Sequence, residues 1–136
     1  MENAGVNALN RARACWNAGD LDGYLGLYAQ EAVLHGYVGV EPGFANIKTF
    51  YEAFFTAFPG SRLEFEDVLP SGNSVTCRFV VTGTHEGPFQ GLPPTHKAFH
   101  LPGITILRFE GSRCVERWSQ ADFLSLLQQL GALAAV

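Results

Sequence analysis

The residue with the clearest chemical potential is Asp122, which lies where a strand-like segment meets a helix-like segment. Residues 113–121 have the character of a strand, whereas Phe123, Leu126 and Leu130 follow helical spacing. An acid at such a junction either caps the helix or points back into a pocket lined by the sheet. A carboxylate in an apolar pocket loses hydration and becomes a useful base near neutral pH. Both interpretations of Asp122 are open at this stage.

Two further residue groups could take part in chemistry with Asp122. Trp118 would share a strand face with Asp122 and so place an aromatic wall beside the acid. His35 lies in a short strand candidate, residues 33–38, on the same predicted face as Tyr37. A neutral imidazole there could donate to, or polarise, a substrate oxygen, or it could be a core histidine bonded to backbone.

The other histidines are predicted to have no catalytic or metal role. His96 and His100 are four residues apart, a spacing that binds zinc on helices. Prolines on both sides favour a strand, in which four residues span about 13 Å, too far for one metal ion to bridge. The sequence therefore predicts no metal site, and it places His85 at a rim or on the surface.

Periodicity predicts the elements that must position these residues. Apolar residues at helical spacing predict helices at residues 8–16, 21–28 and 47–58, with Asp20 as a cap of the second. Beyond Gly60 the pattern alternates and predicts strands at residues 62–68, 74–85, 97–109 and 113–121. The third of these strands is expected to bulge at Pro102, because proline cannot donate to a ladder. Helices followed by an antiparallel meander and a closing helix indicate an α+β fold, whose curved sheet would enclose a conical cavity.

Composition narrows the function classes. The 136 residues suit a single domain, 1–136, and the 47% hydrophobic content is enough for a sizeable core. A net charge of −4 with no basic run argues against nucleic-acid and membrane partners. With no signal-peptide core and no membrane-spanning stretch, a cytoplasmic location is expected. The three cysteines are interpreted as small core residues in a reducing compartment.

Five segments resemble the SnoaL-like polyketide cyclases, a family of the nuclear-transport-factor-2-like superfamily. They are NAGDLDGYLGLY at 17–28, FP at 58–59 with LEFED at 63–67, TGTHEGPFQGLPPT at 82–95, ERWSQAD at 116–122 and LQQLG at 127–131. The resemblance covers nearly the whole chain in order. It implies a cone-shaped, cystatin-like α+β barrel with a mostly apolar pocket, usually assembled as a homodimer.

The resemblance also implies an activity and site residues. In the cyclases that define the family, an acid near the end of the last strand acts as general acid/base in the intramolecular aldol closure of a polyketide ester, with no cofactor. Asp122 matches that acid, and His35 matches a histidine often found after the second helix. Some relatives carry a further acid where this chain has Thr105, so that carboxylate is missing here.

We therefore expect a cofactor-independent cyclase, by class an isomerase or aldol-type lyase, that acts on a small hydrophobic carbonyl compound. Asp122 would abstract a proton next to a carbonyl, and His35 would stabilise the enolate oxygen. The alternatives are an epoxide hydrolase or isomerase on the same fold, or a non-catalytic dimer that binds a hydrophobic ligand. The residues expected to bind the substrate are Tyr37, Tyr51, Phe54, Phe55, His100, Thr105 and Trp118.

Overall fold

The computed structural model describes residues 3–133 and contains four helices and five strands in that part of the chain. In order, they are α1 (Ala4–Asn17), α2 (Leu21–Leu25), β1 (Tyr28–His35), α3 (Phe44–Ala57), β2 (Arg62–Ser71), β3 (Ser74–Thr84), β4 (Ala98–Glu110), β5 (Arg113–Ala121) and α4 (Phe123–Gln129). Within residues 3–133, no helix has the length and apolar character needed to cross a membrane.

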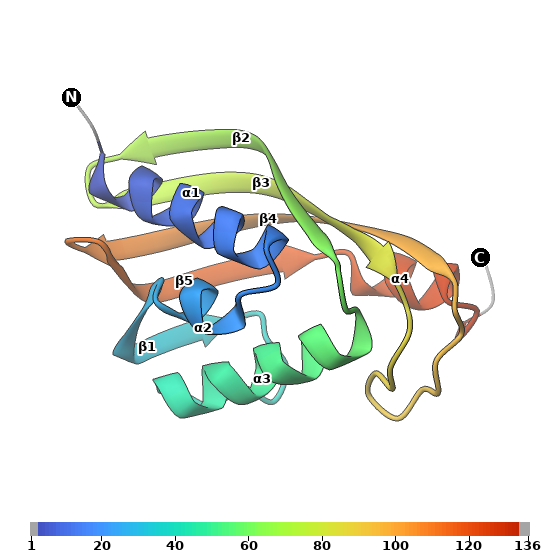
Figure 1. Cartoon of the computed structure of the whole chain (residues 1–136). Helices are drawn as coiled ribbons and strands as arrows, with labels where there is room; N and C mark the ends of the chain where they lie inside the picture. Colours follow the sequence, from blue (N-terminus) through green and yellow to red (C-terminus); the bar gives the residue numbers. More distant parts are fainter. Residues whose placement is uncertain (1–2, 134–136) are drawn as a thin grey trace.

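The five strands form one sheet in the order β1-β5-β4-β3-β2. Strands β2 to β5 make an antiparallel meander, and β1 joins its edge by pairing in parallel with β5. Helices α1 and α3 pack on the same side of the curved sheet, α1 across β2 and β3 and α3 beside β1 (Figure 1). The fold class predicted from the sequence, α+β with a curved sheet against the N-terminal helices, is confirmed.

Each long strand has one face toward the helices and one toward solvent. Along β4, Leu101, Thr105 and Leu107 are buried, whereas Ile104 and Ile106 between them are exposed. Strand side chains alternate with a period of two, so one register decides which residues reach the interior. On β5 the interior positions are Arg117, Ser119 and Ala121.

The second predicted helix ends earlier than the sequence pattern indicated. Asp20 caps α2 by accepting a hydrogen bond from the Gly23 backbone N–H, as predicted. The helix stops at Leu25, however, and Tyr28 opens β1 instead. Glycines at 23 and 26 weaken a helix by roughly 1 kcal/mol each, which favours the early end. Tyr28 therefore enters the core from a strand.

The predicted bulge at Pro102 is absent, because β3 and β4 keep one continuous register through Pro102 and Gly103. The Pro102 carbonyl accepts a hydrogen bond from the Asp122 backbone N–H, so its backbone polar groups face the β5 side. Pairing with β5 begins only at Gly103. The missing proline N–H therefore removes no ladder bond.

Candidate functional site

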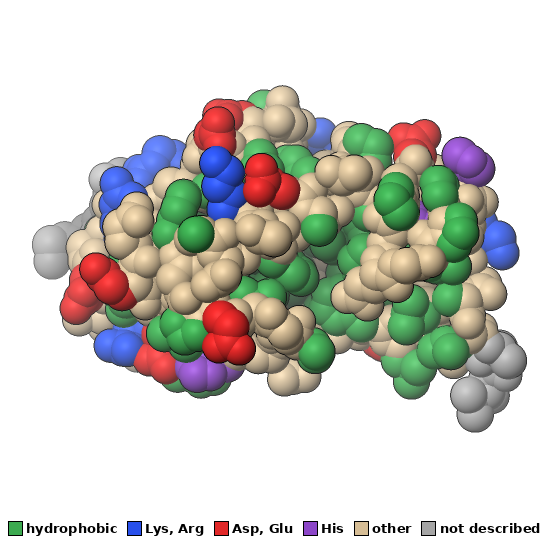
Figure 2. Space-filling view, turned by 90° about the horizontal axis from the view of Figure 1, so that it is seen from below, with side chains coloured by type: hydrophobic (Ala, Val, Ile, Leu, Met, Phe, Trp, Pro, Cys, Tyr) green, Lys and Arg blue, Asp and Glu red, His purple; other side chains and the backbone are tan. Residues whose placement is uncertain are grey.

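A pocket lies between α1, α3 and the concave face of the sheet, where the cone shape was expected to leave space. Its volume is about 60 Å³, and its walls are mostly aromatic and aliphatic. Hydrophobic side chains are visible in a recess on the α3 side of the molecule (Figure 2). The lining residues are Leu9, Ala12, Trp16, Tyr24, Leu27, Gly36, Tyr37, Phe50, Tyr51, Phe54, Leu63, Phe65, Phe79, Val81, Leu101, Arg117, Ser119, Ala121 and Phe123.

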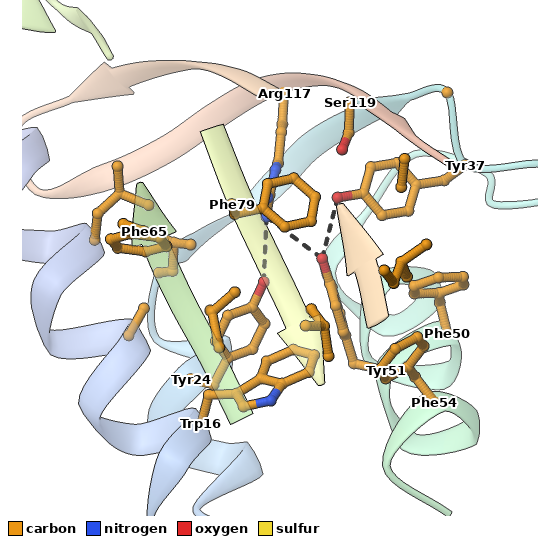
Figure 3. Close-up of a pocket in the computed structure, with 18 of the residues that line it drawn as sticks. Trp16, Tyr24, Tyr37, Phe50, Tyr51, Phe54, Phe65, Phe79, Arg117 and Ser119 are labelled. Carbon is orange, nitrogen blue, oxygen red and sulfur yellow. Dashed lines mark hydrogen bonds between the residues drawn. The ribbon is translucent and has the colours of Figure 1, made fainter. Parts of the chain in front are cut away.

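The polar end of this pocket is built around Arg117. Its side chain projects inward from β5 and is 8% exposed. The Nη1 atom donates to the hydroxyl oxygens of Tyr28 (2.6 Å), Tyr24 (3.2 Å) and Tyr51 (3.4 Å). The guanidinium carbon lies 6.0 Å from the centre of the Tyr37 ring, a cation–π distance. Figure 3 shows the Tyr24, Tyr37 and Tyr51 hydroxyls pointing toward the guanidinium.

The tyrosines are also bonded to one another. The hydroxyl oxygens of Tyr24 and Tyr28 are 3.0 Å apart, those of Tyr28 and Tyr51 3.0 Å, and those of Tyr37 and Tyr51 3.2 Å. The four hydroxyls thus form a chain from α2 through β1 and α3 to the loop after β1. Each rotor is constrained by a neighbour, which preorganises the cluster.

Thr105 fixes the orientation of the guanidinium. Its hydroxyl donates to the Trp118 backbone carbonyl (2.8 Å) and accepts a bond from Nε of Arg117 (2.9 Å). Thr105 was predicted to bind substrate; the structure places it behind Arg117, outside the pocket lining. The remaining nitrogen, Nη2, makes no hydrogen bond within residues 3–133.

Arg117 carries a buried positive charge without a balancing carboxylate. Among the described residues, no Asp or Glu lies within salt-bridge distance of it. Burial works against the charge, but the surrounding tyrosines outweigh it and hold the pKa of Arg117 above its ordinary value. Desolvation raises the pKa values of Tyr24, Tyr28 and Tyr51, and the Arg117 charge opposes it. The tyrosines therefore stay protonated at neutral pH.

Ser119 adds a free donor next to Arg117. It lines the pocket two residues further along β5, and its hydroxyl bonds to nothing in the part of the chain that the structure describes. Figure 3 shows Ser119 beside Tyr37. Gly36 makes this approach possible: its φ is +86°, and a Cβ added there would lie 2.0 Å from the Ser119 carbonyl oxygen. The glycine lets the chain turn under β5 and bring Tyr37 into the pocket.

Asp122 does not line this pocket, and its expected placement there is wrong. It shares a strand face with Trp118 and Gln120, as predicted, but that face is the outer one. Its carboxylate caps α4 by accepting from the Ser125 backbone N–H (3.0 Å). Asp122 borders a different cavity on the outer face, about 270 Å³, beside Arg78 and Ile104. Its catalytic role stays an untested prediction.

His35 also faces outward. Its Nε2 lies 2.7 Å from Glu116, and its ring stacks on Trp118 with 5.2 Å between centres. The expectation that His35 and Tyr37 share a face is wrong, because the bend at Gly36 separates them. His35 was expected to stabilise an enolate oxygen beside Asp122, but neither residue lines the pocket.

The other predicted binding residues divide between pocket and surface. Tyr37, Tyr51 and Phe54 line the pocket. Phe55 packs against Trp16 outside the lining, and Trp118 is on the outer face. His100 is exposed, and its backbone N–H and carbonyl bond to the Gln129 side chain.

The expectation for His85 at a rim is wrong. Its side chain is completely buried, and Nδ1 accepts a bond from the Thr95 backbone N–H (3.1 Å). It packs on Phe58 under the loop between β3 and β4. Nε2 has no partner within the described residues. Across residues 3–133, His, Cys, Asp and Glu side chains form no cluster of three that could hold a metal ion.

The residues that sequence reasoning missed are Arg117, Ser119, Tyr24 and Tyr28. The signal was present in the alternation of β5, where an inward register for Asp122 excludes an inward Arg117. The predicted register placed the acid inside. Tyr24 and Tyr28 fell within the helix predicted at residues 21–28, and Tyr51 was expected to bind substrate; all three are buried, and their hydroxyls meet at one cation.

The fold is of the nuclear-transport-factor-2-like type, and the sequence comparisons assign the chain to a family. The chain belongs to the SnoaL-like polyketide cyclase family, whose model matches residues 6–130. It is similar to the nogalonic acid methyl ester cyclase of Streptomyces nogalater, with 29% identity over 128 residues, 93% of this chain and 91% of that protein. Membership supports a cyclase-type function.

Solved structures show the same fold. AclR of Streptomyces galilaeus, a candidate hydroxylase, is 29% identical with a TM-score of 0.84, over 96% of this chain and 83% of that one. IdmH of Streptomyces antibioticus, a candidate polyketide cyclase, is 28% identical with a TM-score of 0.78, over 95% and 99%. TsrD of Streptomyces laurentii, at 24% identity and a TM-score of 0.86 over 98% and 99%, adds evidence for the fold alone.

The outward placement of Asp122 leads to a testable prediction. Asp122→Ala removes the cap and is expected to lower the free energy of unfolding by about 1 kcal/mol, while Asp122→Asn, which can still cap, changes it by much less. Turnover should be retained in both. Melting curves beside an activity assay check this, and a loss of activity by orders of magnitude in a well-folded Asp122→Asn variant would restore the acid to the mechanism.

Proposed function

We propose that the protein is a cyclase that closes a ring within a small, apolar, carbonyl-bearing polyketide, and that Arg117 with its tyrosines stabilises the oxyanion that forms. The observation that supports this is the buried guanidinium with free Nη2 hydrogens at the end of an aromatic pocket. Preorganised donors aimed at developing negative charge are a large term in enzymatic catalysis. Among residues 3–133, the pocket lining contains no carboxylate and no histidine.

The aldol step needs few groups from the protein. An enolate carbon supplies an electron pair to a ketone carbon of the same molecule, and a carbon–carbon bond forms. The π pair of that ketone moves to its oxygen, which takes a proton from a tyrosine hydroxyl or water. At the start a proton passes from carbon to water, and at the end one returns from water to oxygen, directly or through a tyrosine hydroxyl that water reprotonates, so the product is an isomer of the substrate. Arg117 carries the enolate charge before the bond forms.

The rest of the pocket holds the chain in a folded conformation. Its apolar walls exclude water, and intramolecular reactions gain greatly from such confinement. A volume of about 60 Å³ is small for a polyketide, so the half-buried Tyr37, Phe50 and Phe65 must move apart when substrate enters. An epoxide hydrolase needs an acid to activate water, and the lining offers none.

The proposal is tested with nogalonic acid methyl ester, the compound named for the relative in Streptomyces nogalater. The purified protein is incubated with the ester, and the product is analysed by liquid chromatography, mass spectrometry and ¹³C NMR. A product of unchanged mass that has lost one ketone signal supports the cyclase. Binding of the ester without conversion, at enzyme concentrations equal to the ester, would leave a non-catalytic ligand-binding protein as the function.

A homodimer remains our prediction, with the outer sheet face as the interface. That face exposes Ile104, Ile106 and Trp118, with exposed fractions of 56%, 43% and 40%. Burying them between two copies removes apolar area from water at roughly 25 cal/mol per Å². Light scattering at micromolar concentration should give twice the mass of the chain, and Ile104→Lys should shift it toward the monomer. A monomeric wild-type protein would refute the prediction. A cytoplasmic location likewise stays a prediction.

A further inference from the structure

The buried charge of Arg117 has no counter-charge nearby among the described residues, and this indicates a charge on the ligand in addition to its apolar character. Burying a cation without a partner costs several kcal/mol. Arg117 compensates with neutral hydroxyls only, and its Nη2 group and the Ser119 hydroxyl remain unbonded within residues 3–133. Arg117 and Ser119 both line the pocket, so two N–H hydrogens and one O–H hydrogen there have no acceptor among the described residues.

The ionisable groups around Arg117 come from six places in the fold. They are Tyr24 on α2, Tyr28 on β1, Tyr37 in the following loop, Tyr51 on α3, Cys77 on β3 and Cys114 on β5. Burial raises the pKa values of Tyr24, Tyr28 and Tyr51, and it raises those of the two thiols to about 11. Near neutral pH, none of these five groups with a raised pKa, three tyrosines and two cysteines, supplies a negative charge.

We propose that the pocket binds its substrate as an oxyanion, the enolate or phenolate of an acidic carbonyl compound, with the charged oxygen against Nη2 of Arg117 and the Ser119 hydroxyl. The inference rests on the proposed function and narrows its substrate class. It also explains how a cyclase can work with no base among its pocket residues. The proton leaves an already acidic carbon or hydroxyl to water, and the pocket selects the anion.

Two small compounds test this because they differ by one methyl group, which removes the acidic proton. The probe is 4-nitrophenol, whose phenolate has its own visible absorption band, and the control is 4-nitroanisole, its methyl ether. Both are single rings, which suits a narrow cavity. Titration of the protein into 4-nitrophenol at several pH values gives the pKa of the bound phenol. We expect that pKa to fall by at least about one unit, since the phenolate should bind roughly tenfold more tightly than the phenol.

Variants assign the effect to Arg117. Arg117→Met should abolish the shift in the probe's pKa, whereas Arg108→Met should leave it unchanged. Arg108 is a matched control because it is exposed on the outer face and paired with Glu116. The wild-type comparison does not depend on whether a variant folds.

The outcomes separate this inference from the proposed function. A bound phenol that stays protonated, equal affinity for the methyl ether, or no binding of 4-nitrophenol would each overturn the oxyanion pocket, even if the ester is cyclised. A clear downward shift without any cyclisation would support the oxyanion pocket and count against the cyclase.

Discussion

Arg117→Met is expected to lower kcat/KM for ring closure by about 10²–10³-fold, the usual cost of removing one oxyanion donor. Methionine matches the length of the arginine stem and leaves the Tyr24–Tyr28–Tyr51 hydroxyl chain bonded to itself. Only the charge and its N–H groups are lost. The measurement is steady-state cyclisation of the ester, by chromatography, with wild type and variant at equal concentration.

The same substitution should not destabilise the fold. Replacing a buried ion pair by well-packed apolar side chains is often neutral or stabilising by about 1–4 kcal/mol, and Arg117 is buried without any partner charge among the described residues. The melting temperature of Arg117→Met is therefore expected to equal or exceed that of the wild type. Lower activity together with higher stability in this variant would indicate that the arginine serves function and not stability.

Two controls make the result decisive. Arg117→Lys keeps the charge but loses the bond to Thr105, so it should retain part of the activity. Arg108→Met should behave as wild type, because Arg108 lies on the outer face. Full activity in Arg117→Met would refute the oxyanion role, and a large fall in melting temperature would show that the arginine is structural.

Gly36→Ala should reduce the free energy of unfolding by about 2–5 kcal/mol. About 1–2 kcal/mol comes from an alanine at positive φ, and a further 1–3 kcal/mol from overpacking. The new Cβ would fall 2.0 Å from the Ser119 carbonyl oxygen, so β1 and β5 must separate locally. Urea denaturation curves provide the measurement, and displaced Ser119 and Tyr37 should also reduce activity.

Gly39→Ala isolates the effect of the clash. Gly39 has nearly the same backbone angle, φ +80° against +86°, but has no atom within 4 Å of an added Cβ. It should cost only the backbone contribution, about 1–2 kcal/mol. If both variants lost the same free energy of unfolding, the close approach of Gly36 to β5 would make no contribution to stability.

The sequence predicted the elements better than it predicted their orientation. Alternation in residues 74–85 and helical spacing in residues 47–58 follow from burial on one face, which a pattern records directly. In β5 both faces carry polar residues, and the single aromatic residue, Trp118, lies on the outer face, so alternation alone does not say which face is inside. The resemblance to the cyclases favoured an inward Asp122. The face of β5 that carries Trp118 and Gln120 was therefore predicted to be the inner one, although it is the outer one.

The site is formed by contacts between residues far apart in the sequence, and no local sequence pattern predicts such contacts. Tyr24 and Tyr51 lie on helices whose spacing predicts only a buried face, and both are buried. That their hydroxyls meet at Arg117 depends on the sheet order, in which β1 pairs with β5. His85 was misplaced for a related reason: its segment reads as a strand end, and the following loop covers it.

The arginine–tyrosine cluster has a consequence for how the chain folds. Its hydrogen bonds join residues separated by 93, 89 and 66 positions, and β1 must wait for β5 before it can pair. Contacts of such long sequence separation slow folding. During synthesis, the N-terminal tyrosines are made long before Arg117 leaves the ribosome, so their hydroxyls stay hydrated until late. Completion of the polar core should therefore follow the synthesis of β5.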